Sequence, residues 1–164
     1  MTIVDSRALS LKQALAIAAG QPVPFNPQSI EGVNAIQPHD KVVLVSIRDS
    51  MMPETFQDSE DVCVVEFADI EPMNINFVPP EDSEYMTEAH AKKILEFITK
   101  WHSRPERVLF LVHCRHGMCR SGAVADFVGL ICGLGYRNTR RRNPQIVPNH
   151  WVQYQLFKTH FKQT

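Results

Sequence analysis

Three short runs of apolar, largely β-branched residues constrain the fold of this chain more than any other feature. They are KVVLVSI (41–47), DVCVVEFADI (61–70) and RVLFLV (107–112). Runs this apolar are typical of strands that are covered on both faces of a parallel sheet. Residues 2–6, TIVDS, are expected to add a short edge strand.

Segments with helical spacing alternate with these runs. The expected helices cover 8–19, 87–102 and 123–134, and a fourth follows Asn149, which is expected to be its N-cap. Apolar residues support the first and last of them. Leu11, Leu15 and Ala18 share one face of the first, and the stripe of the last, interpreted as a core-facing surface, consists of Trp151, Tyr154, Phe157 and Phe161. The alternation predicts an α/β fold of three layers, with a central, mostly parallel sheet of about four to five strands flanked by helices.

The remaining segments are expected to be loops. Residues 21–40 and 71–86 are rich in proline, and the arginine-rich run 137–144 is interpreted as a solvated surface loop. A loop as long as 71–86 is often functional in a compact domain. Because the chain contains no repeat and no low-complexity linker, we expect residues 1–164 to form a single domain.

The charge balance limits the classes of partner. A formal net charge of −1 gives no general attraction to nucleic acid or to anionic lipid, so any attraction for anions must be local. The sequence has no apolar run long enough for a membrane span, and residues 11–20 fit an amphipathic helix better than a secretory signal. Four cysteines without paired CxxC spacing favour free thiols in a reducing cytoplasm.

The stretch HCRHGMCRSG (113–122) concentrates the reactive side chains of the chain. It lies between the expected strand 107–112 and the expected helix 123–134, where open α/β sheets bind ligands. The backbone N–H groups of such a loop can turn inward around an anion, and the following helix adds partial positive charge. Gly117 gives the loop the backbone freedom that a tight turn needs.

Two residues of this loop suggest chemistry on phosphate. A free thiol has a pKa of about 8.5, which a helix N-terminus and nearby cations lower, so Cys114 is expected to be a thiolate nucleophile. A loop that curls once brings Arg120 over it, where a planar guanidinium can bind two oxygens of one phosphate.

The same residues carry a family resemblance. His113, Cys114, Gly117, Arg120 and Ser121 match the pattern His-Cys, two residues, Gly, two residues, Arg-Ser, which resembles the cysteine-dependent protein tyrosine phosphatase superfamily. The position of the loop in the chain resembles the dual-specificity-like branch. EFADI, EAHAKKILEFITKW and VPNHWVQYQLF are similar to segments of small bacterial and phage tyrosine-phosphatase-like proteins.

The resemblance implies a phosphoric monoester hydrolase that needs no metal and no cofactor. Cys114 would attack phosphorus and form a phosphocysteine, and Ser121 would assist the departure of the thiolate. His113 would orient the loop. The phosphate would be bound by the loop residues Arg115, His116, Gly117, Met118, Cys119 and Arg120. The expected partner is a phosphotyrosine-containing protein or another phosphorylated substrate, with nucleic acid only as a phosphate-bearing substrate.

The general acid has two candidates. Asp69 ends the run 61–70, where the acid loop of the family begins, whereas Asp82 has a spacing to Cys114 nearer to that of dual-specificity relatives. We favour Asp69, because topology survives an insertion better than spacing does. Glu81 and Glu84 lie in the same acidic segment as Asp82 and stay open as candidates.

Other interpretations compete with a phosphatase that acts on proteins. The basic residues Arg115 and His116 keep open a non-protein polyanion, such as an RNA 5′-triphosphate or an inositol phosphate. The chain could also bind phosphoproteins without turnover. A zinc site formed by His113, Cys114, His116 and Cys119 lacks the second separated ligand pair that structural zinc sites use. Cys119 or Cys63 could protect Cys114 as a disulfide partner.

Overall fold

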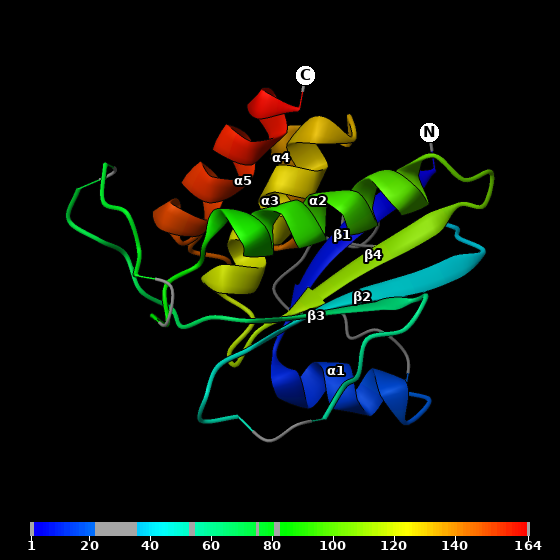
Figure 1. Ribbon diagram of the computed structural model, residues 1–164. Coiled ribbons are helices and arrows are strands. Elements are labelled where there is room, and N and C mark those ends of the chain that lie inside the picture. Colours follow the sequence, from blue (N-terminus) through cyan, green and yellow to red (C-terminus); the bar gives the residue numbers. More distant parts are fainter. Residues whose placement is uncertain (1, 22–35, 53–54, 75, 81–82, 164) are drawn as a thin grey trace.

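The apolar runs of the sequence lie side by side as a parallel sheet in the computed structural model (Figure 1). The structure describes residues 2–21, 36–52, 55–74, 76–80 and 83–163. Within these ranges the strands are β1 (Ile3–Leu9), β2 (Lys41–Arg48), β3 (Val62–Glu66) and β4 (Val108–His113). They form one four-stranded sheet in the order β1-β4-β2-β3, and each neighbouring pair is parallel.

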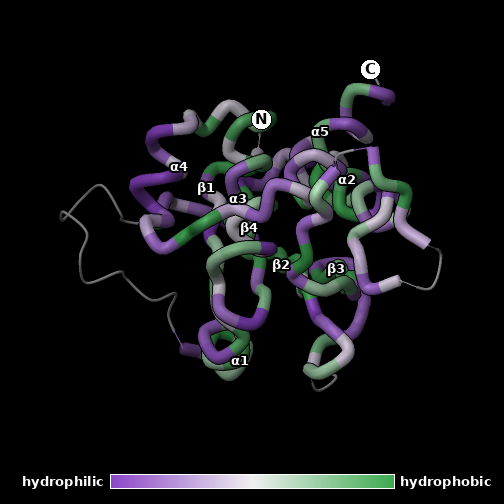
Figure 2. The backbone as a smooth tube through the Cα atoms, turned by 90° about the vertical axis from the view of Figure 1, so that its left-hand side faces the viewer, coloured by the Kyte–Doolittle hydropathy of each residue, from purple (hydrophilic) through white to green (hydrophobic). Residues whose placement is uncertain are grey.

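Helices cover both faces of this sheet, since parallel strands require crossover connections. In the described part of the chain the helices are α1 (Leu11–Ala18), α2 (Glu88–His102), α3 (Arg120–Ile131), α4 (Tyr136–Arg142) and α5 (His150–Lys162). Figure 1 shows α1 alone on one face and the other four helices on the opposite face. In Figure 2 the row of strands lies between α1 below and these helices above. The predicted three-layer α/β fold with a mostly parallel sheet is confirmed.

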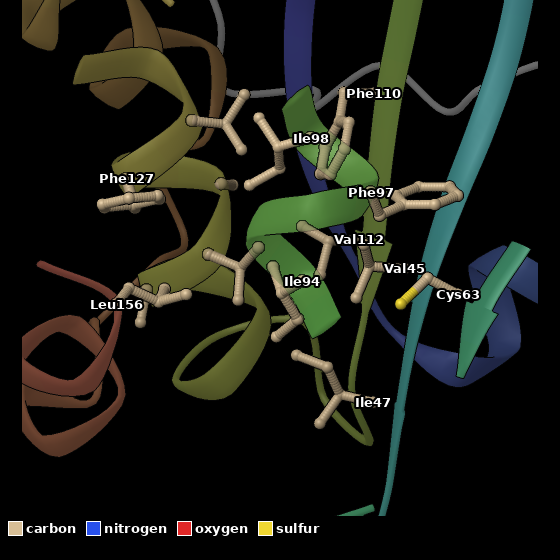
Figure 3. Close-up of a cluster of buried hydrophobic side chains, with 14 of the residues drawn as sticks. Val45, Ile47, Cys63, Ile94, Phe97, Ile98, Phe110, Val112, Phe127 and Leu156 are labelled. Atoms are coloured by element: carbon tan, nitrogen blue, oxygen red, sulfur yellow. The ribbon is translucent and has the colours of Figure 1, made fainter. Parts of the chain in front are cut away.

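Alternate side chains of the strands pack into two apolar clusters. Val45, Ile47 and Val112 point toward α2, α3 and α5 and form the larger core with residues such as Ile94 and Phe127 (Figure 3). The smaller cluster lies on the α1 side and is built on Leu9, Leu109 and Leu111. Because both faces are buried, the strands read as continuous apolar runs rather than as an alternating pattern.

The first strand and helix divide the chain differently from the prediction. The expected edge strand 2–6 is confirmed as an edge strand but extends to Leu9, so the expected helix 8–19 starts only at Leu11. Ser10 caps α1, and its side chain and that of Gln13 bond each other's backbone N–H groups. The predicted apolar face of this helix is wrong, because Ala14 is buried whereas Leu15 is exposed.

Two further boundaries differ at the C-terminal end. The expected helix 123–134 starts earlier, at Arg120, and the expected surface loop 137–144 contains α4. Asn149 does cap α5, because its side chain accepts the N–H of Val152. The predicted stripe of this helix is only partly right, since Trp151 is buried whereas Phe161 is 67% exposed.

The two proline-rich segments, 21–40 and 71–86, were expected to be loops. The expected strand 61–70 narrows to β3, and the described residues of 71–86 form no helix or strand. Most of the expected loop 21–40 lies outside the described residues. No helix in the described ranges has the length and apolar character that a membrane span needs.

Candidate active site

The loop 114–120 lies at the carboxyl edge of the sheet, between β4 and α3. Its carbonyl oxygens are bonded by groups that surround the loop. Arg115 O accepts the N–H of Leu11 at 3.2 Å, and Gly117 O accepts Nε2 of Gln145 at 3.3 Å. Two more carbonyls are bonded in the same way by the segment before α5: Met118 O by Val147 N at 3.1 Å and Cys119 O by Asn149 N at 3.0 Å. With these carbonyls bonded to the surroundings, the amides of the loop are available to face its centre, as in an anion-binding nest.

Gly117 lets this loop pack against the end of β1. Its φ is +74°, and a Cβ built there would lie 2.5 Å from Leu9 C and from Ser10 N. Any other residue would both strain the backbone and collide with the neighbouring chain. The loop therefore takes its curvature from a close approach to the link between β1 and α1.

Cys114 lies at the floor of the loop and is 3% exposed. Its Sγ is 3.1 Å from Oγ of Ser121, in the first turn of α3. Burial by itself raises the pKa of this thiol. The Ser121 hydroxyl, the backbone N–H groups of Ser121 and Gly117, and the positive charge of Arg120 outweigh burial, so the pKa of Cys114 falls below its ordinary value. The site thus favours a thiolate, which is the nucleophilic form.

Arg120 is the first residue of α3, and its guanidinium is buried beside the loop. Nη1 donates to the carbonyl of Phe67 at 2.8 Å, and Nη2 donates to Oδ2 of Asp49 at 3.3 Å. The buried Nε has no partner among the described residues. The N-cap residue Cys119 makes no side-chain cap bond, and in the first turn of α3 the N–H of Ser121 bonds the Cys114 thiol. These groups can bind an anion together.

His113 supports the loop from the α1 side of the sheet. Its Nδ1 lies 3.1 Å from the carbonyl of Cys114 and must carry the proton, since a carbonyl only accepts. Its Nε2 then accepts the Ser46 hydroxyl at 2.6 Å. Burial lowers the pKa of His113 and outweighs the bond to Cys114 O, which raises it. The neutral imidazole therefore joins β2 to the start of the loop.

Asp69, the favoured acid, lies at the rim of the loop. Its Oδ1 accepts Nδ2 of Asn149 at 2.7 Å, and Asn149 in turn donates its backbone N–H to Cys119 O at 3.0 Å. The Asp69 carboxylate also bonds the Cys119 side chain. Asn149 thus ties the segment after β3 to the loop and to α5. The alternative acid Asp82, together with Glu81, lies outside the described residues. The side chain of Glu84 bonds Ser50, which follows β2.

Three of the predicted phosphate-binding residues are exposed on the loop: Arg115, His116 and Met118. His116 forms an antiparallel bridge with Ser10. The guanidinium of Arg115 donates to Oδ1 of Asp49 at 2.9 Å. The Asp49 carboxylate therefore bonds both Arg115 and Arg120.

The four cysteines are free thiols in different surroundings. Burial raises the pKa of Cys63 to about 11 and that of Cys132 to about 12. Burial, with the nearby Asp69 charge, also raises the pKa of Cys119. Cys114 is thus the one cysteine whose pKa is lowered. In the described ranges, no three His, Cys, Asp or Glu side chains are grouped so that they could hold a metal ion. Both ring nitrogens of His113 are engaged in bonds within the protein.

Three residues that shape this site were not expected from the sequence. Ser46 interrupts the apolar run 41–47, and a hydroxyl in a strand buried on both faces signals a polar partner. Asp49 follows that strand at the carboxyl edge of the sheet. Gln145 lies in a segment without recognisable pattern, and its side chain joins Ala8 O to Gly117 O.

Comparison with known proteins finds matches among solved structures. No family model matches the chain, and no curated protein matches it. The crystal structure of a human tyrosine phosphatase-like serine/threonine/tyrosine-interacting protein is similar, with a TM-score of 0.48 and 22% sequence identity. The match covers 74% of this chain and 78% of that chain. A likeness of this degree says nothing about activity, so the chemistry must come from the geometry of the site.

Proposed function

We propose that this protein hydrolyses phosphate monoesters through a phosphocysteine intermediate on Cys114, with aryl phosphates such as phosphotyrosine as substrates. The observation that carries the proposal is the pairing of Cys114 Sγ with Ser121 Oγ at 3.1 Å, beneath a loop that also holds the Arg120 guanidinium. The lowered pKa of this buried thiol favours its thiolate form, which is the nucleophile.

The first step places negative charge on the oxygens of the phosphoryl group while the Cys114 thiolate attacks phosphorus in line. Arg120 and the amides of the loop would stabilise this charge, because they are fixed before the substrate arrives. An acid protonates the leaving oxygen. Asp69 fits this role, since it lies beside Cys119, next to Arg120 in the chain, and Asn149 orients its carboxylate.

In the second step, water attacks the phosphocysteine and the thiolate of Cys114 leaves. The Ser121 hydroxyl donates to that sulfur and stabilises its returning negative charge. Asp69 as carboxylate would accept the proton of the water. Each proton that the acid gives up in the first step is thus recovered in the second.

Kinetics with a small aryl phosphate test this proposal. We expect turnover by the wild type and none by Cys114→Ser, which keeps the shape of the nucleophile but not its thiolate. Asp69→Asn should lower kcat by about 10²–10⁴-fold on a substrate with a poor leaving group, whereas Asp82→Asn should leave it unchanged. The reverse result would assign the acid to Asp82. Turnover that Cys114→Ser retains would contradict the proposal.

A substrate panel then addresses selectivity. Phosphotyrosine and phosphoserine peptides, an inositol phosphate and a 5′-triphosphorylated RNA are compared by kcat/KM. We expect the phosphotyrosine peptide to lead. A lead for the RNA or the inositol phosphate would move the function to a polyanion phosphatase. Binding of phosphopeptides without turnover would identify a phosphoprotein-binding module instead.

A further inference from the structure

Asp49 lies where a phosphate-binding site would not be expected to tolerate a negative charge. It follows β2 at the carboxyl edge of the sheet, and its side chain is 14% exposed. Oδ1 accepts Nη2 of Arg115 at 2.9 Å and the N–H of Met51 at 3.0 Å. Oδ2 accepts Nη2 of Arg120 at 3.3 Å. One carboxylate is therefore divided between two arginines of the loop.

The guanidinium of Arg120 is held from two neighbouring strands. Phe67, the residue after β3, accepts Nη1 at 2.8 Å, and Asp49, the residue after β2, accepts Nη2 at 3.3 Å. A guanidinium has five N–H donors, so three remain for a ligand, the buried Nε among them. These two contacts fix the plane of the guanidinium and thereby the direction in which its remaining donors point.

The same carboxylate opposes the binding of a phosphate. Burial raises the pKa of Asp49, but its bonds to Arg115 and to Met51 N–H and the charge of Arg120 outweigh burial. The pKa is therefore lowered, and the group is ionised at neutral pH. A charged carboxylate beside Arg120 repels a bound phosphate and offsets part of the positive charge that favours the Cys114 thiolate. Orientation and anion affinity are therefore in conflict at this residue.

We propose that Asp49 is a positioning residue that orients Arg120 for the transition state at the expense of ground-state affinity for phosphate. The proposal rests on the phosphatase function proposed above. It predicts an unusual pair of effects: removal of the charge lowers kcat but tightens phosphate binding. If the residue merely supported the fold, its replacement would lower kcat and also weaken phosphate binding.

The test compares Asp49→Asn with Asp40→Asn. Asp40 precedes the same strand β2 and forms a two-bond ion pair with Arg107 at 2.9 and 3.1 Å, at the opposite edge of the sheet. Both variants lose one carboxylate charge at an end of β2, but only Asp49 touches the loop arginines. Three quantities are measured: kcat on an aryl phosphate, the inhibition constant of inorganic phosphate, and the pH midpoint of Cys114 alkylation by iodoacetamide.

For Asp49→Asn we expect kcat to fall about ten- to a hundredfold through misorientation of Arg120. The inhibition constant of phosphate should fall about threefold or more, and the alkylation midpoint should move down by about half a pH unit or more, because a negative charge has left the site. Asp40→Asn should change none of these. Unchanged kcat, a raised inhibition constant, or an alkylation midpoint that stays or rises in Asp49→Asn would overturn the proposal.

A second variant and two measurements that need no turnover complete the test. If Asp49→Asn fails to fold, Asp49→Glu retains the charge but displaces it by one methylene. The alkylation midpoint should then stay while kcat falls, and an unchanged kcat would overturn the proposal. The alkylation midpoint and phosphate binding need no turnover. A wild type without phosphatase activity would therefore remove the proposed function, while these two measurements still decide whether the Asp49 charge acts on the site.

Discussion

Cys114 Sγ and Ser121 Oγ lie 3.1 Å apart across the loop, the sulfur after β4 and the hydroxyl in the first turn of α3. A phosphate bound in the loop would lie above these two atoms. It joins the floor of the loop to the helix whose N-terminus gives the loop its positive end.

Ser121→Ala removes this bond and should raise the pKa of Cys114. A hydrogen bond to a charged group contributes about 1.5–3 kcal/mol, which corresponds to about one to two pH units. The thiolate predominates only above the pKa, so the pH midpoint of alkylation by iodoacetamide should be higher in the variant than in the wild type. The measurement is the alkylation rate as a function of pH.

The same variant should slow the second chemical step more than the first. Without the hydroxyl, the departing thiolate loses a donor, so phosphocysteine accumulates and a burst of aryl alcohol precedes a slower steady state. Ser121→Thr keeps the hydroxyl and serves as the control. An unchanged alkylation profile in Ser121→Ala would contradict the role given to this bond.

Gly117→Ala should abolish activity through the geometry of the loop. The new Cβ would lie 2.5 Å from Leu9 C and Ser10 N, in addition to straining a φ of +74°. Gly133 is a matched control, since its φ is +73° and a Cβ there meets nothing within 4 Å. Gly133→Ala should cost only the backbone strain, about 1 kcal/mol, and leave activity intact. Urea unfolding and aryl phosphate turnover check both variants.

Ser46→Ala should lower the free energy of unfolding by about 1–3 kcal/mol, because it leaves Nε2 of the buried His113 without a partner. Ser103→Ala is the control. It removes an exposed hydroxyl that bonds Lys100 O at 3.0 Å, and the free energy should change by less than about 0.5 kcal/mol. An equal decrease in the free energy of unfolding in the two variants would contradict a larger contribution of the buried bond.

The pH dependence of stability follows from the lowered pKa of His113. The unfolded chain takes up this proton at a pH near 6.5, whereas the folded chain takes it up only at a lower pH. The contribution of the neutral ring is therefore complete above about pH 6.5 and is lost as the pH falls toward the folded pKa. His113→Gln should flatten this part of the curve of unfolding free energy against pH.

The sheet could be predicted from the sequence because its strands are nearly uniform apolar runs. Helix α3 shows the limit of that reasoning. Its glycines lower its intrinsic helix propensity, so this helix must be held by packing, and Gly129 is where Thr139 of α4 packs against it, so close that a Cβ would collide with the Thr139 side chain. Packing between α3 and α4 decides this helix, not propensity, and neither that contact nor the existence of α4 is visible in a local pattern.

The nucleophile and Arg120 could be named from spacing because strand, loop and helix follow one another in the chain. Ser46 and Asp49 could not, since β2 reaches the loop only through the sheet order, which places it beside β4. Asp69 was within reach as the end of a strand. Its link to the loop depends on Asn149, which is distant in sequence and had been interpreted only as a helix cap.

The most direct test of the central claim is a rapid-quench experiment with an aryl phosphate, followed by mass spectrometry of the intact protein and of its peptides. The account predicts the mass of one phosphoryl group on the peptide that contains Cys114, with a larger amount in Ser121→Ala and none in Cys114→Ser. Turnover of the substrate with no phosphorylated Cys114 peptide at any quench time in Ser121→Ala would contradict it.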